Sequence, residues 1–178
     1  DSGWEQLRQD RLTKALELGV VAQGTAMVKM STTQDWDVLP DDRKRYEAKR
    51  MAVYGGMVAA MDFHIGRLID HLKATGQYDN TLFVLTSDNG TEVSGNPDPG
   101  NVRARVLMGA QGYTSEYETL GLKGSFNSIS PSFASASASP LAFYKFYAGE
   151  GGLRVPLIIA GQSIRNKGEL NHALSHVT

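Results

Sequence analysis

The chain has 178 residues, a mass of 19.3 kDa and no cysteine; 41% of its residues are hydrophobic and 21% are charged. These values predict one globular domain or a large part of one, and they exclude a disordered chain, a disulfide-stabilised scaffold and a thiolate metal site. Its 18 basic and 19 acidic residues give a net charge of −1, which offers no electrostatic basis for binding nucleic acid or an anionic membrane.

Two helices are predicted in the first half of the chain, over 3–18 and over about 41–74. In the longer helix, apolar residues recur at steps of three and four from Tyr54 to Leu72, which is typical of an amphipathic helix. Glycines inside a helix lower its intrinsic stability. Three internal glycines therefore predict that a neighbour, most naturally a sheet, packs closely on this helix: Gly55, Gly56 and Gly66.

Two short apolar runs predict buried β-strands, over about 81–86 (TLFVLT) and about 155–160 (VPLIIA). A long helix that leads into a buried strand is typical of an α/β fold with a mainly parallel sheet. Between the strands, the roughly 50 residues of 91–140 show little periodicity, and we interpret them as a loop or lid that shapes a binding site.

Asp88 and Asn89 follow the first predicted strand directly. In open α/β sheets, ligands bind beyond the carboxyl ends of the strands. Carboxylate and amide oxygens are hard ligands that suit Ca²⁺ or Mg²⁺, and Gly90 lets the backbone turn around them. The residues alone support two interpretations, a metal site and an ordinary Asp-Asn-Gly turn.

Lys145 lies between aromatic residues in the segment YKFY, five residues before the segment EGGLRVP. Its ammonium group suits an anionic ester oxygen and the charge that develops on a leaving group. A lysine between aromatic residues is also typical of a surface position whose stem packs on the rings. Both interpretations stay open at this point.

The combination of TLFVLTSDNG, YKFYAGEGGLRVP and the helix YGGMVAAMDFHIGRLIDHL resembles the sulfatase family, and bacterial arylsulfatases in particular, through nearly the whole chain. The resemblance implies an α/β sandwich like that of alkaline phosphatase, of which residues 1–178 form the later part of the catalytic domain. It also implies that Asp88 and Asn89 are ligands of Ca²⁺ (or Mg²⁺), and that Lys145 contacts the substrate sulfate and acts in catalysis.

The resemblance implies a nucleophile as well, a formylglycine made from the Cys or Ser of a Cys/Ser-x-Pro-x-Arg motif. None of the six prolines lies in such a motif. We therefore expect part of a sulfuric ester hydrolase for small sulfate esters, inactive by itself. The parent protein would carry the formylglycine. Exchange of elements between copies, a form of self-association, is one way to cover the open sheet edges.

Two other functions remain open from the sequence. A phosphodiesterase or phosphonate hydrolase of the same superfamily would use a similar metal site and a similar tetrahedral ester. A non-catalytic α/β binding module would use Asp88 and Asn89 only as a turn. No apolar run approaches the roughly 20 residues that span a bilayer, so we expect a soluble protein, in the bacterial periplasm or cytoplasm.

Overall fold

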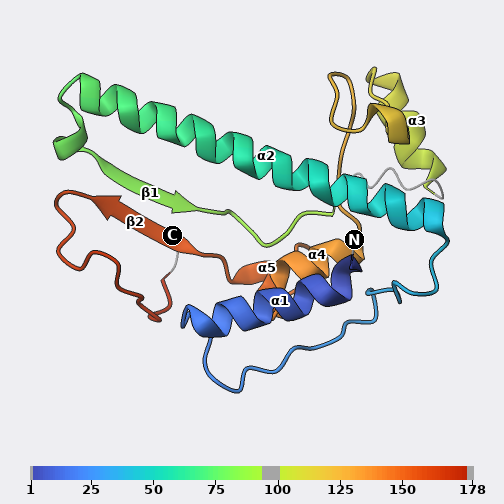
Figure 1. Cartoon of the computed structure of the whole chain (residues 1–178), viewed down its shortest axis with the longest axis horizontal. Helices are drawn as coiled ribbons and strands as arrows, with labels where there is room; N and C mark the ends of the chain where they lie inside the picture. Colours follow the sequence, from blue (N-terminus) through green and yellow to red (C-terminus); the bar gives the residue numbers. More distant parts are fainter. Residues whose placement is uncertain (1, 94–100, 176–178) are drawn as a thin grey trace.

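The computed structural model describes residues 2–93 and 101–175. Its elements in chain order are α1 (Gly3–Glu17), α2 (Asp41–Ala74), η1 (Tyr78–Asn80), β1 (Leu82–Thr86), α3 (Val102–Ala110), η2 (Tyr117–Thr119), α4 (Pro131–Ala138), α5 (Glu150–Leu153) and β2 (Leu157–Gly161). In the view of Figure 1, α2 runs along most of the molecule, β1 and β2 lie below its C-terminal part, and α1 and α4 lie below its middle and N-terminal part.

The long helix α2 has 34 residues and occupies the region where the apolar period predicts a helix. Asp41 and Asp42 lie in its first turn and His71 and Lys73 in its last, where acidic and cationic side chains, respectively, favour the helix dipole. The helix ends before Gly76, whose φ of +69° is the left-handed conformation common at helix ends. Sequence signals therefore account for both ends of α2.

The packed core lies between α1, the N-terminal half of α2 and α4. Trp4, Trp36 and Phe133 meet edge to face, with ring centroids 4.7 Å apart for the two tryptophans and 5.3 Å apart for Trp4 and Phe133. The Trp4 indole N–H donates to the Gln34 carbonyl at 2.9 Å, so its polar group stays bonded inside the core. Three residues of α2 pack against this cluster: Ala48, Met51 and Tyr54.

Arg50, which belongs to a buried ion pair within α2, joins this helix to the chain that precedes α4. Glu47 and Arg50 are both almost fully buried, and Arg50 Nη1 lies 3.2 Å from Glu47 Oε1. Arg43 Nη2 approaches the same oxygen at 2.6 Å, and Arg50 Nε donates to the Ser128 carbonyl at 2.5 Å. Because buried charges are costly when unpaired, this arrangement favours one position of α2 against the core.

The strands β1 and β2 pair antiparallel, with Val84 opposite Ile159. Within residues 2–93 and 101–175 they form the single sheet, so the predicted mainly parallel sheet is not confirmed. The predicted burial of the strands is wrong, since Val84 is 59% and Ile159 48% exposed. A sheet of two strands with no packed layer on its faces cannot remove its side chains from water.

The part of α2 over residues 55–74 is equally uncovered. A Cβ added at Gly55, Gly56 or Gly66 would meet no atom within 4 Å, so the predicted close neighbour is absent from the described part of the chain. Met61, in the predicted apolar stripe, is 51% exposed. None of the helices described combines the length and the hydropathy needed to cross a membrane.

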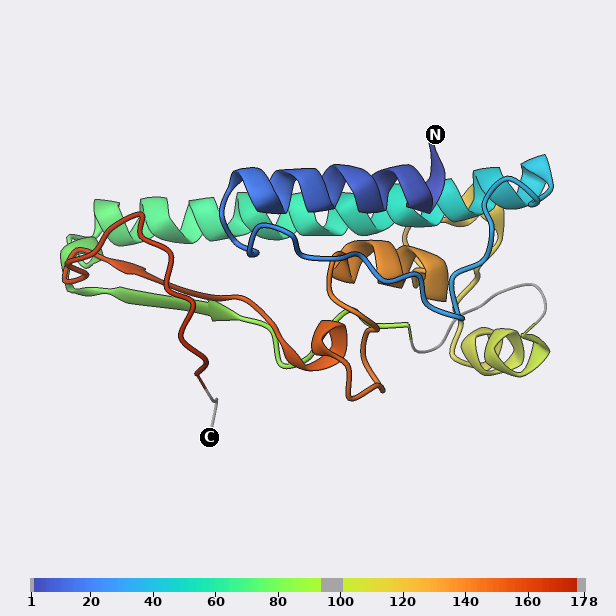
Figure 2. The same cartoon turned by 90° about the horizontal axis from the view of Figure 1, so that it is seen from below.

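The segment predicted as a loop or lid, 91–140, contains the α-helices α3 and α4 and the short 3₁₀ helix η2, and its residues 94–100 lie outside the described residues. Both helices begin with a side-chain cap, in which Asn101 accepts from Ala104 N and Ser130 accepts from Phe133 N. Helix α4 is buried on nearly all sides. It therefore lacks the polar face that gives an amphipathic helix its periodic pattern of apolar and polar residues in the sequence. Figure 2 shows α4 enclosed between α1 and the segment that leads to α5.

Candidate functional site

The turn that follows β1 and the segment that contains Lys145 lie side by side. The Lys145 N–H donates to the Thr91 carbonyl at 3.1 Å, and the Gly90 N–H donates to the Gly152 carbonyl at 2.9 Å. These two backbone bonds join parts of the chain that are more than 50 residues apart. The candidate functional site is therefore a backbone-paired unit of two loops.

Three glycines make this close approach sterically feasible. A Cβ at Gly90 would overlap the Gly151 carbonyl, a Cβ at Gly151 would overlap the Phe143 carbonyl, and a Cβ at Gly152 would overlap the Tyr147 carbonyl. Only a residue without a side chain lets these backbones meet. The glycine pair of the EGG segment is thus explained by packing around the Lys145 segment rather than by a simple turn.

Two strained residues bracket Lys145. Phe143 and Phe146 have φ values of 67° and 79°, in the left-handed region that bulky residues rarely adopt. Such conformations cost about 1–3 kcal/mol each and persist where the surroundings fix them. The Phe143 N–H donates to Met30 Sδ at 2.6 Å, and Tyr144 is buried in the core. The backbone that carries Lys145 is therefore held in one conformation.

Tyr144 anchors this segment as a neutral phenol. Burial is the main cause that raises its pKa above the usual 10.0, and a hydrogen bond with Thr32 partly opposes this rise. The Tyr144 and Tyr147 rings meet edge to face, with centroids 5.2 Å apart. The residue next to Lys145 is consequently fixed by packing and carries no charge near neutral pH.

The Lys145 side chain extends from this fixed backbone and forms an ion pair with the carboxylate of Glu92, which belongs to the loop after β1. Its ammonium also lies 5.4 Å from the centre of the Phe146 ring. The Lys145 side chain is 33% exposed and that of Glu92 is 44% exposed, so both groups reach solvent. An anion in solution can approach this ammonium, but it meets the Glu92 carboxylate there too.

The structure places Asp88 and Asn89 at the end of β1, in the same turn. Asp88 is exposed and Asn89 is half-buried, and the Ser87 hydroxyl donates to the Asn89 carbonyl at 2.8 Å. Their side-chain oxygens suit Ca²⁺ in chemical type, but Ca²⁺ takes 6–8 oxygen ligands. Across 2–93 and 101–175, no group of three or more His, Cys, Asp or Glu side chains is placed to hold a metal ion.

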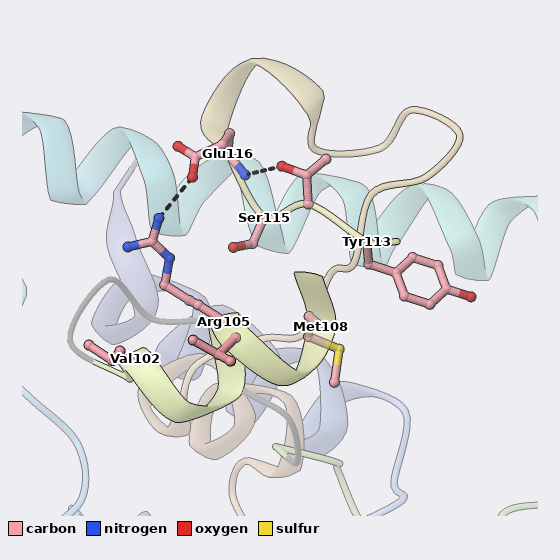
Figure 3. Close-up of a pocket in the computed structure, with 8 residues that line it drawn as sticks. Val102, Arg105, Met108, Tyr113, Ser115 and Glu116 are labelled. Carbon is pink, nitrogen blue, oxygen red and sulfur yellow. Dashed lines mark hydrogen bonds and ion pairs between the residues drawn. The ribbon is translucent and has the colours of Figure 1, made fainter. Parts of the chain in front are cut away.

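A separate hollow lies between α3 and the chain from Tyr113 to Glu116 (Figure 3). It has a volume of about 360 Å³ and includes the pair of Arg105 Nη2 and Glu116 Oε1, 2.9 Å apart. Lys145, Asp88 and Asn89 do not line it. The hollow is therefore distinct from the candidate functional site.

Sequence reasoning missed Glu92 and the two left-handed phenylalanines. The Glu92–Lys145 pair spans 53 positions, so no local spacing reveals it. The conformations of Phe143 and Phe146 have no signal either, because left-handed positions are usually inferred from Gly or Asn. Arg154 Nη1 lies 3.6 Å from Glu150 Oε2, an ion pair within the EGGLR segment.

The described residues thus form helices and a two-stranded antiparallel sheet that present a lysine next to a turn with two hard oxygen donors. The family model Sulfatase matches residues 10–178, and the chain belongs to the sulfatase family. It is 31% identical over 172 residues to an arylsulfatase of Klebsiella aerogenes, an alignment that covers 96% of this chain and 36% of that protein. It is 34% identical over 164 residues to an uncharacterized sulfatase of Schizosaccharomyces pombe, covering 88% and 28% of the two chains.

The chain spans about a third of the length of these two curated relatives. A shorter match, 42% identical over 64 residues, joins it to the uncharacterized sulfatase YdeN of Escherichia coli and covers 35% of this chain and 10% of that protein. The predicted family is confirmed. Sulfatases are hydrolases with an alkaline-phosphatase-like α/β fold that use a metal ion and a formylglycine.

Proposed function

We propose that the chain is part of an arylsulfatase-like sulfuric ester hydrolase, in which Lys145 contacts the sulfate group and Asp88 and Asn89 hold a divalent cation. The observation that carries this proposal is the backbone pairing of the turn after β1 with the Lys145 segment. It connects the metal-ligand candidates and the anion contact. Family membership and the 31% identity to an arylsulfatase support the same assignment.

Each residue would act through its charge and position. The Lys145 ammonium would attract the sulfate oxygens and offset the negative charge that grows on the ester oxygen as the S–O bond breaks. Asp88 and Asn89 would hold Ca²⁺ (or Mg²⁺) as two of its oxygen ligands. The ion would supply further positive charge to the sulfate oxygens. The strained Phe143 and Phe146 would keep Lys145 in place.

The test of the anion contact is a ¹H–¹⁵N NMR titration of the 178-residue chain with phenyl sulfate. We expect shifts centred on the amides of Thr91 and Lys145, lost in Lys145→Gln and kept in the matched control Lys123→Gln, whose lysine is also exposed. Shifts that survive Lys145→Gln unchanged would contradict the assignment.

The same method tests the metal ligands. We expect Ca²⁺ to shift the amides around Asp88 and Asn89, and Asp88→Asn to weaken that response. The matched control Asp79→Asn removes a carboxylate before β1 and should leave the response intact. A Ca²⁺ response indifferent to Asp88→Asn would count against the metal site.

No Cys/Ser-x-Pro-x-Arg motif occurs in this sequence, so we expect no hydrolysis of p-nitrophenyl sulfate by the chain alone. Robust turnover would refute that expectation. Hydrolysis of bis-p-nitrophenyl phosphate in place of the sulfate ester would favour the phosphodiesterase alternative.

A further inference from the structure

Glu92 and Lys145 do not meet as two freely moving surface side chains. They project from loops whose backbones are already joined next to them, at the Thr91 carbonyl and the Lys145 N–H. Val93, the neighbour of Glu92, packs against the core, as does Tyr144, the neighbour of Lys145. Both ends of the ion pair are therefore anchored, and the carboxylate stays close to the ammonium.

This arrangement changes what the lysine offers to an anion. The charges of Lys145 and Glu92 sum to zero, so an anion that contacts the ammonium gains less attraction than it would from a lysine alone. The repulsion from Glu92 grows with the charge of the anion. A sulfate monoester carries one negative charge, whereas a phosphate monoester carries nearly two above its second pKa of about 6.

We propose that Glu92 is a specificity-determining residue that makes the Lys145 subsite favour monoanionic esters over dianionic ones. The inference rests on the proposed function, because it takes Lys145 as the contact for the anionic ester. The role assigned to Glu92 follows from its ion pair with Lys145 in the structure. No spacing in the sequence indicates it.

The experiment compares phenyl sulfate with phenyl phosphate in NMR titrations of the 178-residue chain at pH 8. At about 5 Å in a water-like dielectric, one unit charge changes affinity about four-fold for each charge on the anion. We therefore expect Glu92→Gln to tighten phenyl sulfate binding about four-fold and phenyl phosphate binding about sixteen-fold. The selectivity between the two ligands would change about four-fold.

Two further variants separate charge from structure. Glu116→Gln makes the same change of net charge in the distinct hollow beside α3 and should leave the selectivity as in the unaltered chain. Glu92→Asp keeps the negative charge with a shorter side chain, so it should retain the preference for phenyl sulfate. Circular dichroism at 25 °C checks that each variant is folded.

The outcomes separate the two proposals. If Lys145→Gln leaves both affinities unchanged, or neither ligand binds the unaltered chain, the proposed function fails and this inference fails with it. If Lys145→Gln weakens both ligands while Glu92→Gln shifts both equally or not at all, the role of Glu92 alone is refuted. If Glu92→Asp behaves as Glu92→Gln does, the charge argument is refuted.

Discussion

The two ends of α2 lie in contrasting surroundings. Around its N-terminal half, Trp4 and Phe133 are almost completely buried and the charges of Glu47 and Arg50 are paired inside the protein. Along its C-terminal half, Gly66 faces open space and the neighbouring β1–β2 pair exposes apolar side chains on both faces. The apolar period of α2 runs from Tyr54 to Leu72, mostly along the uncovered part of the helix, so periodicity shows which face is apolar but not whether that face is covered.

The candidate site lies where these two regions meet. The chain leaves the exposed strand β1, turns through Asp88 and Asn89, and reaches Val93, which packs against the core. Lys145 follows the buried Tyr144 on the opposite loop. The packed region therefore fixes the Lys145 side of the site, while the exposed region carries the two proposed metal ligands.

The largest expected effect tests the packed region. Trp4→Ala removes a fully buried aromatic side chain and should lower the free energy of unfolding by about 3–5 kcal/mol. The counterpart Val84→Ala, on the exposed strand β1, should change it by roughly 0.5 kcal/mol or less. Urea unfolding followed by circular dichroism measures both, and equal losses would remove the distinction between the regions.

The boundary between the regions is tested by Gly90→Ala. The added methyl group overlaps the Gly151 carbonyl, so the paired loops must separate, at a cost of about 1–3 kcal/mol. We also expect the Thr91–Lys145 backbone bond to weaken, measured as faster hydrogen exchange of the Lys145 amide. Unchanged exchange would show that the loops do not depend on this contact.

The exposed region predicts a change of opposite sign for Gly66→Ala. Nothing lies within 4 Å of the added carbon, and alanine is better than glycine inside a helix by about 0.8–1 kcal/mol. The variant should therefore be more stable by up to about that amount in the same urea assay. Destabilisation would mean that a partner packs closely on this part of α2.

A smaller effect follows from the raised pKa of Tyr144. Burial raises the pKa in the folded chain above 10.0, so the unfolded chain releases this proton at lower pH. The neutral phenol contributes fully to the free energy of unfolding below pH 10, and this contribution is lost as pH rises through the pKa of the folded state. Unfolding free energies between pH 8 and 11 should fall less steeply in Tyr144→Phe.

Part of that slope should persist in Tyr144→Phe, since burial raises the pKa of Tyr46 as well. Tyr113→Phe, at an exposed tyrosine, serves as the matched control and should reproduce the slope of the unaltered chain. If Tyr144→Phe and Tyr113→Phe gave the same slope, the buried phenol would not be the source.

Local signals account for much of the fold. The period of α2, its acidic first turn and the glycine after it define that helix, and the β-branched runs locate both strands. The features that sequence patterns could not predict are those that depend on contacts between residues distant in the chain. The exposure of β1 arises because no layer packs on it within residues 2–93 and 101–175, and the antiparallel register of Val84 with Ile159 follows from how two distant runs meet.

The site divides in the same way. Asp88, Asn89 and Lys145 stand in recognisable motifs and were identified from them, but their metal and sulfate roles are still predictions. Glu92 carries no motif, and its importance arises only when the two loops pair. The helix α4 was missed because its Ser and Ala residues show no polar face, although Ser130 and Pro131 at its start are typical of a helix N-terminus.

That helix has a consequence for how the chain tolerates change. A segment rich in serine and alanine is commonly taken for a linker or for a site that tolerates insertions. Here Ala134, Ser135 and Ala136 are fully buried, and the Thr33 hydroxyl donates to the Ser135 hydroxyl oxygen at 3.1 Å. The Ser/Ala segment of α4 is therefore among the least replaceable parts of the chain, because the size, number and polarity of its residues are all constrained. An insertion placed there on the basis of composition alone would disrupt the core.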